Sequence, residues 1–423
     1  MNMNNKIEIQ TFGCRLNTYE SEVMRSLAQD AGLGNAIIFN TCSVTNEAER
    51  QARQAIRKAR KENPNVQIFV TGCAAQIKPE FFAAMPEVDR VIGNHEKMTI
   101  ESFMPSQERV LVNDIMSVKE TATHLISGFE GHARAFIQVQ NGCDHRCTFC
   151  SIPYGRGNSR SVPIPTIVTQ IQKLLSENYN EIVLTGVDIT SYGSDLPGNP
   201  NLGQMIRRVL NLVPDLKRLR LSSLDPVEVD DDLFDLIGTN DRLLPHLHLS
   251  LQAGDDLILK RMKRRHLRQD VIHFVEKTRK LRPDIVFGAD VIAGFPTESD
   301  EMFENTYNLI KDLHIPLLHI FPYSPRPGTP AAKMPQVVSA IRKERAQKLR
   351  DLGDVLLNQE LNAHIGKKAI MILEKGNEGK EEHFLPVQLL DNSLNFNLGQ
   401  EVHIDLIAQE NQKLIGKVIN VHV

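Results

Sequence analysis

The arrangement of the six cysteines constrains this chain more than any other feature, because they fall into two sets of three. One set stands on a single short loop with the spacing C-x3-C-x2-C: Cys143, Cys147 and Cys150. Three thiolates at this spacing can hold three irons of a [4Fe–4S] cluster, and the missing fourth cysteine leaves one iron open for an outside ligand. Zinc would have to borrow His145 or another group, and a disulfide would leave one thiol unpaired. The loop therefore predicts a catalytic iron–sulfur cluster.

The other set is spread along the first ~100 residues, where strand and helix patterns alternate. Cys14, Cys42 and Cys73 each follow a predicted strand; these strands are Lys6–Phe12, Ala36–Asn40 and Val66–Thr71, with helices at Tyr19–Ala31 and Asn46–Asn63. Such alternation implies a parallel sheet, whose strands end on a common edge. Each cysteine alone could be a small buried hydrophobe. Together they predict a second cluster, again with one open iron.

A longer alternation of strands and helices follows, from residue 135 to about residue 325. The predicted strands are Ala135–Gln140, Glu181–Val187, Arg218–Ser223, His246–Leu251, Ile285–Ile292 and Pro316–Tyr323. Helical patterns between them include Pro165–Asn178, Leu202–Val213, Gln269–Leu281 and Asp300–Leu313. Six βα units favour an open or partial α/β barrel, in which ligands gather at the carboxyl ends of the strands.

The last part of the chain reads as a helix, Gln336–Ala363, and a small β-barrel of the kind often used on RNA. Its predicted strands are Ala369–Glu374, Phe384–Leu390, Glu401–Ala408 and Leu414–His422. The whole chain is thus expected to be α/β with domains at 1–112, 130–335, 336–362 and 363–423. The barrel segment holds six lysines, no arginine and eight acidic residues, so its net charge is negative.

RNA contact is therefore expected on local basic runs, since the net charge of the chain is also slightly negative, at −3. The two candidates are Glu47–Lys61 and Lys260–Arg268, although either could be an ordinary solvated helix face. The start MNMNNKIEIQ has no signal-like apolar run, and no segment approaches the ~18 apolar residues of a membrane span. We expect a cytoplasmic protein, where thiols stay reduced, and a monomer without membrane contact.

Several segments resemble the radical S-adenosylmethionine methylthiotransferases, and the resemblance extends along essentially the whole chain. They are GCDHRCTFCSIPYGRGNSRS, EIVLTGVDI, RLSSLDP, LHLSLQAG, GADVIAGFPTE and FPYSPRPGTPA. Gly13–Asn17 (GCRLN), followed by TYESE, resembles the branch that acts on N6-threonylcarbamoyladenosine in tRNA. The branch acting on isopentenyladenosine usually has glutamine and methionine here, and the branch acting on a ribosomal-protein aspartate has proline and lysine. Both substrates remain alternatives, as does an RNA-binding protein with structural clusters.

The resemblance implies two [4Fe–4S] clusters, S-adenosyl-L-methionine and a terminal TRAM barrel. The Cys143/Cys147/Cys150 cluster would cleave S-adenosylmethionine to a 5′-deoxyadenosyl radical, which takes the hydrogen from C2 of adenine. The Cys14/Cys42/Cys73 cluster would supply sulfur, and a second S-adenosylmethionine the methyl group. The substrate would be position 37, next to the anticodon, in the tRNA anticodon stem-loop. A donor such as flavodoxin or ferredoxin would supply electrons.

Four residues are candidate contacts of S-adenosylmethionine, by a looser match to family motifs: Gly186, Ser222 and Gln252 at strand ends, and Arg264 in the segment RMKRRH. Gly186 would let the backbone approach the amino group, and Ser222 would bind ribose or carboxylate. Arg264 would pair with the carboxylate. Each residue also has a structural alternative. Gly186 could form a turn, Ser222 a cap, Gln252 part of the core packing and Arg264 a solvated charge. Asp188 is similarly placed and receives no role.

Overall fold

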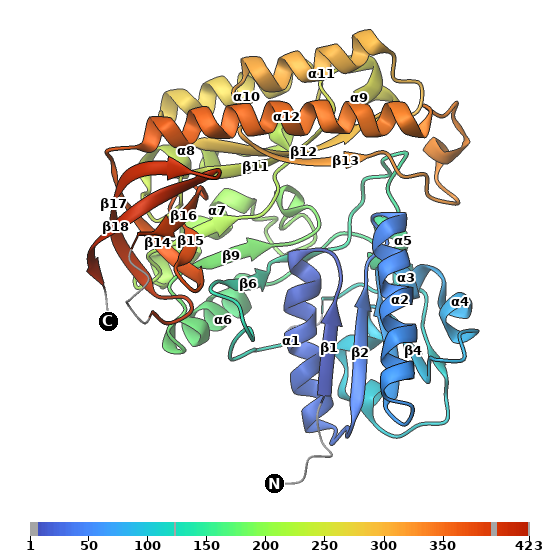
Figure 1. The fold of residues 1–423 in the computed structure, drawn as a ribbon. Coiled ribbons are helices and arrows are strands. Elements are labelled where there is room, and N and C mark those ends of the chain that lie inside the picture. Colours follow the sequence, from blue (N-terminus) through green and yellow to red (C-terminus); the bar gives the residue numbers. More distant parts are fainter. Residues whose placement is uncertain (1–6, 122–123, 391–395, 422–423) are drawn as a thin grey trace.

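The computed structural model describes residues 7–121, 124–390 and 396–421. Figure 1 shows a parallel sheet with its helices at the N-terminal end, a larger α/β part in the middle and a small β-barrel at the C-terminal end. Lys6 and His422, at the outer ends of two predicted strands, lie outside the described residues. Within the described ranges, no helix combines the length and the apolar character needed to cross a bilayer.

The N-terminal sheet has five parallel strands in the order β1-β2-β3-β4-β5. Its strands are β1 Ile7–Thr11, β2 Ala36–Thr41, β3 Gln67–Gly72, β4 Arg90–Ile92 and β5 Val110–Leu111. Its helices are α1 Arg15–Asp30, α2 Asn46–Glu62, α3 Cys73–Ile77 and α4 Pro79–Ala83. The sequence predicted β1, β2 and β3 but not the last two strands, which are too short to show an apolar pattern.

Helix α1 joins the N-terminal sheet to the middle part of the molecule. Leu16, Tyr19 and Val23, on one side of the helix, belong to the large apolar core of the middle part. Met24 and Ala28 pack instead with the strands of the N-terminal sheet. Both sides of α1 are therefore buried, and the helix lies between the N-terminal sheet and the middle part, as Figure 1 shows.

The middle part is the expected partial barrel, made of two three-stranded parallel sheets. Its strands are β6 Ala135–Gln138, β9 Ile182–Thr185, β10 Leu219–Leu221, β11 His246–Gln252, β12 Val286–Ala293 and β13 Leu317–Pro322. Parallel bridges from Leu219 to Leu243 and from Leu224 to Leu249 join the two sheets. The short strands β7 Gln140–Asn141 and β8 Arg160–Ser161 pair beside the cysteine loop. The helices are α5 Ile152–Arg156, α6 Ile164–Ser176, α7 Leu202–Leu212, α8 Asp231–Thr239, α9 Asp256–Met262, α10 Arg268–Leu281 and α11 Asp300–Asp312.

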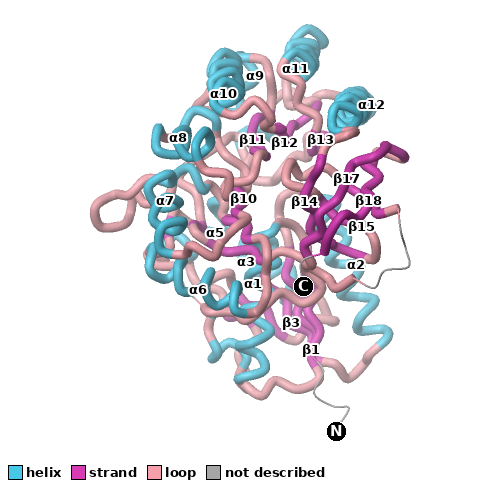
Figure 2. The backbone as a smooth tube through the Cα atoms, turned by 90° about the vertical axis from the view of Figure 1, so that its left-hand side faces the viewer, coloured by secondary structure: helices cyan, strands magenta, loops and turns pink. Residues whose placement is uncertain are grey.

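The long helix α12, Ser339–His364, leads to a closed barrel in the order β14-β15-β16-β18-β17. The strands are β14 Lys368–Lys375, β15 Glu378–Lys380, β16 Pro386–Leu389, β17 Glu401–Glu410 and β18 Lys413–Val421. Four strands were predicted here; β15 was missed because it has three residues and is charged at both ends. Val286 and Leu361 share the apolar core of this barrel, so it packs on β12 and α12. Figure 2 shows the barrel below α12 and beside β13.

Candidate active site

The three N-terminal cysteines lie at the carboxyl edge of the sheet, just after β1, β2 and β3. Cys42 and Cys73 are buried and Cys14 is exposed. Gly13 adopts a φ of +100°, and a Cβ at this position would stand 2.7 Å from the Cys42 Sγ atom, so only glycine fits. Burial, together with the neighbouring thiols of Cys73 and Cys14, raises the pKa of Cys42 to about 12. The three thiols are therefore close enough to act on one another.

A buried group of charges stands behind these three cysteines. Glu20 accepts hydrogen bonds from the Lys97 Nζ atom at 2.6 Å and from the Arg156 Nη1 atom at 2.7 Å. Burial opposes the charge of Arg156, but the charges of Cys73, Glu20 and Cys14 raise its pKa well above the usual value. Two cations against one carboxylate leave an excess positive charge beside the triad. Thiolates that carry a metal cluster need such compensation when they are buried, so this donor set fits an iron–sulfur cluster.

The second triad stands on the loop after β7. The Cys150 N–H donates to the Cys147 carbonyl at 3.1 Å, and the Arg264 Nη1 atom lies 3.7 Å from the Cys147 Sγ atom. Burial and the charge of Asp188 raise the pKa of Cys143, and burial raises that of Cys150 to about 12. All three thiols are half-buried. A guanidinium next to partly accessible thiols suits a cluster that must bind a second molecule.

The two triads lie next to each other in the structure. The hydroxyl oxygens of Ser43 and Ser151, each following a triad cysteine, are 3.2 Å apart. A Cβ added to Gly155 would stand 3.0 Å from the Cys73 Cβ atom, which places α5 against α3, as in Figure 1. The thiol of Cys73 also contributes to the raised pKa of Cys150. Segments more than 70 residues apart thus bring six thiols to one region.

An acidic group borders the second triad. Donor atoms of Cys143, His145 and Asp188 all lie within 4.8 Å of one another. The His145 Nε2 atom is 2.9 Å from Asp188 and 3.4 Å from Glu228. His145 is therefore the group that a zinc ion at this loop would use. Such an ion would engage Cys143 but leave the other two thiols of the triad unused, whereas a cluster uses all three.

Three of the four predicted contacts of S-adenosylmethionine lie at carboxyl ends of strands, Arg264 lies between α9 and α10, and the roles of all four stay predictions. Gly186 follows β9, and a Cβ there would stand 2.7 Å from the Gln140 carbonyl oxygen. Ser222 is buried after β10, where its N–H donates to the Leu184 carbonyl at 2.9 Å. Gln252 ends β11 with a φ of +66°. Arg264 donates at 2.8 Å both to Asp225 and to the Ser250 carbonyl.

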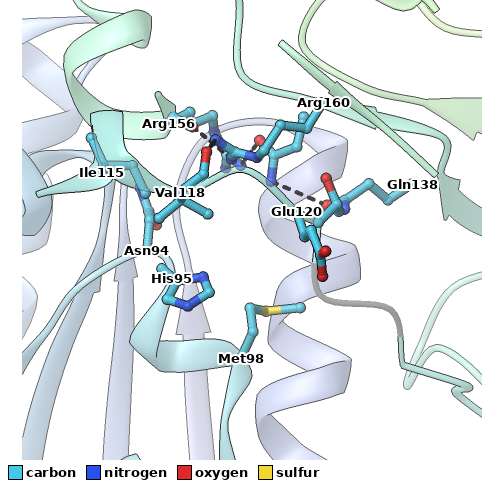
Figure 3. Close-up of a pocket in the computed structure, with 11 residues that line it drawn as sticks. Asn94, His95, Met98, Ile115, Val118, Glu120, Gln138, Arg156 and Arg160 are labelled. Atoms are coloured by element: carbon cyan, nitrogen blue, oxygen red, sulfur yellow. Dashed lines mark hydrogen bonds between the residues drawn. The ribbon is translucent and has the colours of Figure 1, made fainter. Parts of the chain in front are cut away.

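A narrow pocket lies where the N-terminal part and the middle part of the chain meet. Figure 3 shows Arg156 and Arg160 on one side of it and His95 and Met98 on the other. Its volume of ≈ 20 Å³ holds little more than one water molecule. The pocket is therefore a small gap beside Arg156 where the two parts meet. It is too small for S-adenosylmethionine.

The two basic runs differ in the structure. On α2 the side chains of Arg50, Arg57, Lys58 and Lys61 are exposed. In Lys260–Arg268, by contrast, Arg264 is bound next to the second triad, and the Arg268 Nη1 atom donates to the Gly254 carbonyl at 3.0 Å. The second run is therefore partly internal and does not form a continuous basic surface.

Sequence reasoning missed the charges of Glu20, Lys97 and Arg156. Glu20 had a usable signal, because it lies one residue after Tyr19 and three before Val23 on the apolar face of α1. A carboxylate within such a stripe needs a buried partner. Lys97 and Arg156 carry no comparable signal, since their partners are distant in sequence.

Comparison with known proteins gives a consistent result. Residues 137–310 match the radical SAM superfamily, and residues 6–93 match the uncharacterized protein family UPF0004. The chain is 58% identical over 389 residues to the threonylcarbamoyladenosine tRNA methylthiotransferase MtaB of Rickettsia prowazekii, and the alignment covers 92% of each protein. It is 30% identical over 439 residues to a tRNA-2-methylthio-N(6)-dimethylallyladenosine synthase of Clostridium botulinum, covering 97% of this chain and 96% of that protein. The radical S-adenosylmethionine methyltransferase TsrM of Kitasatospora setae shares the fold, with a TM-score of 0.55 at 14% identity, covering 78% of this chain and 77% of that one.

Proposed function

We propose that this chain, which belongs to the family of radical S-adenosylmethionine methylthiotransferases, converts N6-threonylcarbamoyladenosine in tRNA to its 2-methylthio derivative. The observation that carries the proposal is the pair of three-cysteine sites that face one another across the domain contact. Similarity supports the choice of substrate, because identity is 58% to a relative named for threonylcarbamoyladenosine and 30% to one named for dimethylallyladenosine.

Each triad would hold one [4Fe–4S] cluster, the radical SAM cluster on Cys143, Cys147 and Cys150 and the auxiliary cluster on the N-terminal cysteines. Bound there, the clusters and S-adenosylmethionine would supply the radical that activates C2 of adenine, the sulfur atom and the methyl group. The chain's own residues position and shelter these groups. Arg264 holds positive charge beside Cys147, and Arg156 and Lys97 do so behind Cys73. Gly186, Ser222 and Gln252 remain the proposed further contacts of S-adenosylmethionine.

We propose the anticodon stem-loop of tRNA as the partner, with the adenosine beside the anticodon as its reactive base. The exposed cations of α2 support this, because that helix begins four residues after Cys42 and its cations would neutralise phosphates. The reductant would be a small one-electron carrier such as flavodoxin or ferredoxin. The protein would act as a monomer in the cytoplasm.

The test is product analysis with anaerobically reconstituted protein, S-adenosylmethionine and a reductant. Three substrates are compared: stem-loop RNA carrying threonylcarbamoyladenosine, the same RNA carrying isopentenyladenosine, and the ribosomal-protein peptide. Mass spectrometry of the digested products should find a methylthio group on the first substrate alone. A methylthio product on either of the others, with none on the first, would refute the substrate choice.

A non-catalytic iron–sulfur RNA-binding protein is the remaining alternative. It predicts no 5′-deoxyadenosine when the reduced protein is incubated with S-adenosylmethionine. Formation of that product in proportion to protein concentration excludes the alternative without reference to the RNA substrate.

A further inference from the structure

Arg15, the first residue of α1, carries a positive charge that no carboxylate of the described residues neutralises. Within residues 7–121, 124–390 and 396–421, its guanidinium makes no hydrogen bond and no ion pair. The Cζ atom lies over the Phe384 ring, 5.6 Å from its centroid. The side chain is only half-exposed. Because arginine stays charged at every physiological pH and partial burial weakens its hydration, this group is suited to an anionic ligand.

Two carboxylates, Asp290 and Glu181, raise the pKa of Arg15 through their charge, but both already bind other side chains. Glu181 is fully buried among three arginines: Arg134 at 2.6 Å, Arg218 at 3.0 Å and Arg220 at 2.8 Å. Asp290 accepts hydrogen bonds from the His248 Nε2 atom at 3.1 Å and from the His319 Nδ1 atom at 3.2 Å. The surroundings of Arg15 are therefore positive overall, and an additional anion would be favourable there.

Arg15 also links the proposed sulfur-donating triad to the partial barrel, because the charge of Asp290 on β12 acts on its guanidinium. It directly follows Cys14 in the chain. On β11, Leu247, Leu249 and Leu251 pack in the outer apolar core, so His246, His248 and Ser250 point toward the barrel interior. This interior is open to solvent, since the side chain of Asp290 is 24% exposed and that of His319 is 59% exposed. A ligand that enters the barrel can thus reach the Arg15 guanidinium.

We propose that Arg15 binds the carboxylate of the threonylcarbamoyl group and so selects the substrate base; this inference rests on the proposed function. In adenine, N6 and C2 lie on either side of N1, so the substituent on N6 and the carbon that receives sulfur share one edge of the ring. A cation one residue from the sulfur-donating site is placed to hold that substituent. The guanidinium can pair with a carboxylate in bidentate geometry. An isopentenyl group has no charge and would leave the half-buried guanidinium unpaired. The free-energy cost of that unpaired cation would select against isopentenyladenosine.

The test compares anticodon stem-loop RNA carrying threonylcarbamoyladenosine with the same RNA carrying its threonyl methyl ester, which keeps the shape and removes the charge. The wild-type protein should prefer the free acid by at least about tenfold in kcat/KM. Arg15→Gln should lose at least about tenfold on the free acid, mainly through KM, and should turn over acid and ester equally. Arg15→Lys keeps the charge and should retain most of the preference.

Arg25→Gln serves as the matched control, because Arg25 is a second arginine of α1 that is paired with Glu22 and Glu130. Iron content of each variant reports whether the neighbouring Cys14 site is intact. If Arg15→Gln weakens acid and ester by the same factor, Arg15 contacts an RNA phosphate and the inference is wrong. Equal use of acid and ester by the wild-type protein also overturns it, whatever the variants do. Absence of any methylthio product from the free acid instead contradicts the proposed function itself.

Discussion

Both ends of the partial barrel contain buried charged or ionisable groups, but the groups at one end form ion pairs with one another, whereas those at the other end include thiols that do not. At the amino ends of the strands, Glu181 is surrounded by three arginines, and the Phe384 ring of the C-terminal barrel closes the group. At the carboxyl ends and at the adjoining edge of the N-terminal sheet, six free thiols lie in one region, and each is in weak contact with a polar group. The first arrangement pairs its buried carboxylate with three cations and holds two domains together. The second has unused bonding capacity, which is what a cofactor site requires.

Phe384 shows how strongly the amino end is specified. Its φ is +68°, a strained value for an aromatic residue. The ring stacks on His246 with centroids 5.0 Å apart and lies under Arg220 at 4.9 Å and Lys380 at 4.5 Å. The contacts of one ring thus offset the local strain. From this comparison, changes at the carboxyl end should remove chemistry with little loss of stability, and changes at the amino end should do the reverse.

The largest expected effect is that of Cys143→Ala. Loss of one of three thiolates should remove the radical SAM cluster, so formation of 5′-deoxyadenosine falls by at least about 10³-fold, or about 4 kcal/mol in activation free energy. Iron should fall from about eight to about four atoms per chain, as expected when one of two four-iron clusters is lost. The thermal unfolding midpoint of the apoprotein should change little. A large fall in that midpoint would contradict the division between the two ends.

Cys42→Ala tests the other triad at the same end. Iron should again fall to about four atoms per chain. Cleavage of S-adenosylmethionine should continue, because the Cys143 loop is untouched, whereas the methylthio nucleoside should disappear. Measuring 5′-deoxyadenosine and the modified nucleoside in the same reaction separates the two outcomes. Equal loss of cleavage in Cys42→Ala and Cys143→Ala would mean that the two triads form one functional unit.

Glu181→Gln should have the opposite profile. It leaves Arg218 and Arg220 buried without their carboxylate, and Arg134 with Glu374 alone, which should cost about 3–5 kcal/mol of unfolding free energy. Denaturant unfolding followed by circular dichroism measures this loss. The matched control is Glu374→Gln, since Glu374 pairs with Arg134 from a side chain that is 39% exposed, and its loss should cost no more than about 1 kcal/mol. Similar losses for both variants would contradict the idea that the fully buried carboxylate stabilises this end of the barrel more than the exposed one does.

The smallest expected effect is a pH dependence at the same end of the barrel. Burial alone would lower the pKa of His383, but Asp284 at 3.2 Å and Glu381 at 2.7 Å raise it to about 9. The folded-state pKa thus exceeds the value of about 6.5 in the unfolded chain. The resulting stabilisation is complete below pH 6.5 and is lost as the pH rises through 9, with an upper limit of about 3 kcal/mol.

His383→Gln should remove this dependence. Unfolding midpoints measured from pH 6 to pH 9.5 should fall more steeply in the wild-type protein than in the variant. The protection factors of the β15 and β16 amides against hydrogen exchange should fall over the same range. The reason is that His383 links the segment between these strands to Asp284 of the middle part. Parallel pH profiles for the two proteins would assign the dependence to other groups.

The sequence predicted the elements that are long and apolar. Strand β2, with six fully buried residues, and strand β12, with eight residues, have runs of β-branched and aromatic side chains that identify them. Strands β4, β5 and β15 were missed because two or three residues carry no periodicity. The alternation of strands and helices also predicted that the strands of the N-terminal sheet and of the middle part run parallel, as the structure shows.

Spacing along the chain predicted the two groups of three cysteines, since C-x3-C-x2-C is local and the ends of adjacent parallel strands must converge. Only the tertiary structure decided that Cys73 meets the Cys150 loop, that Arg156 reaches Glu20, and that Arg15 is left without a carboxylate. The reason is physical: spacing fixes which atoms share a loop or an edge. Whether a buried charge finds a partner depends on how domains more than 100 residues apart dock, and no local pattern carries that information.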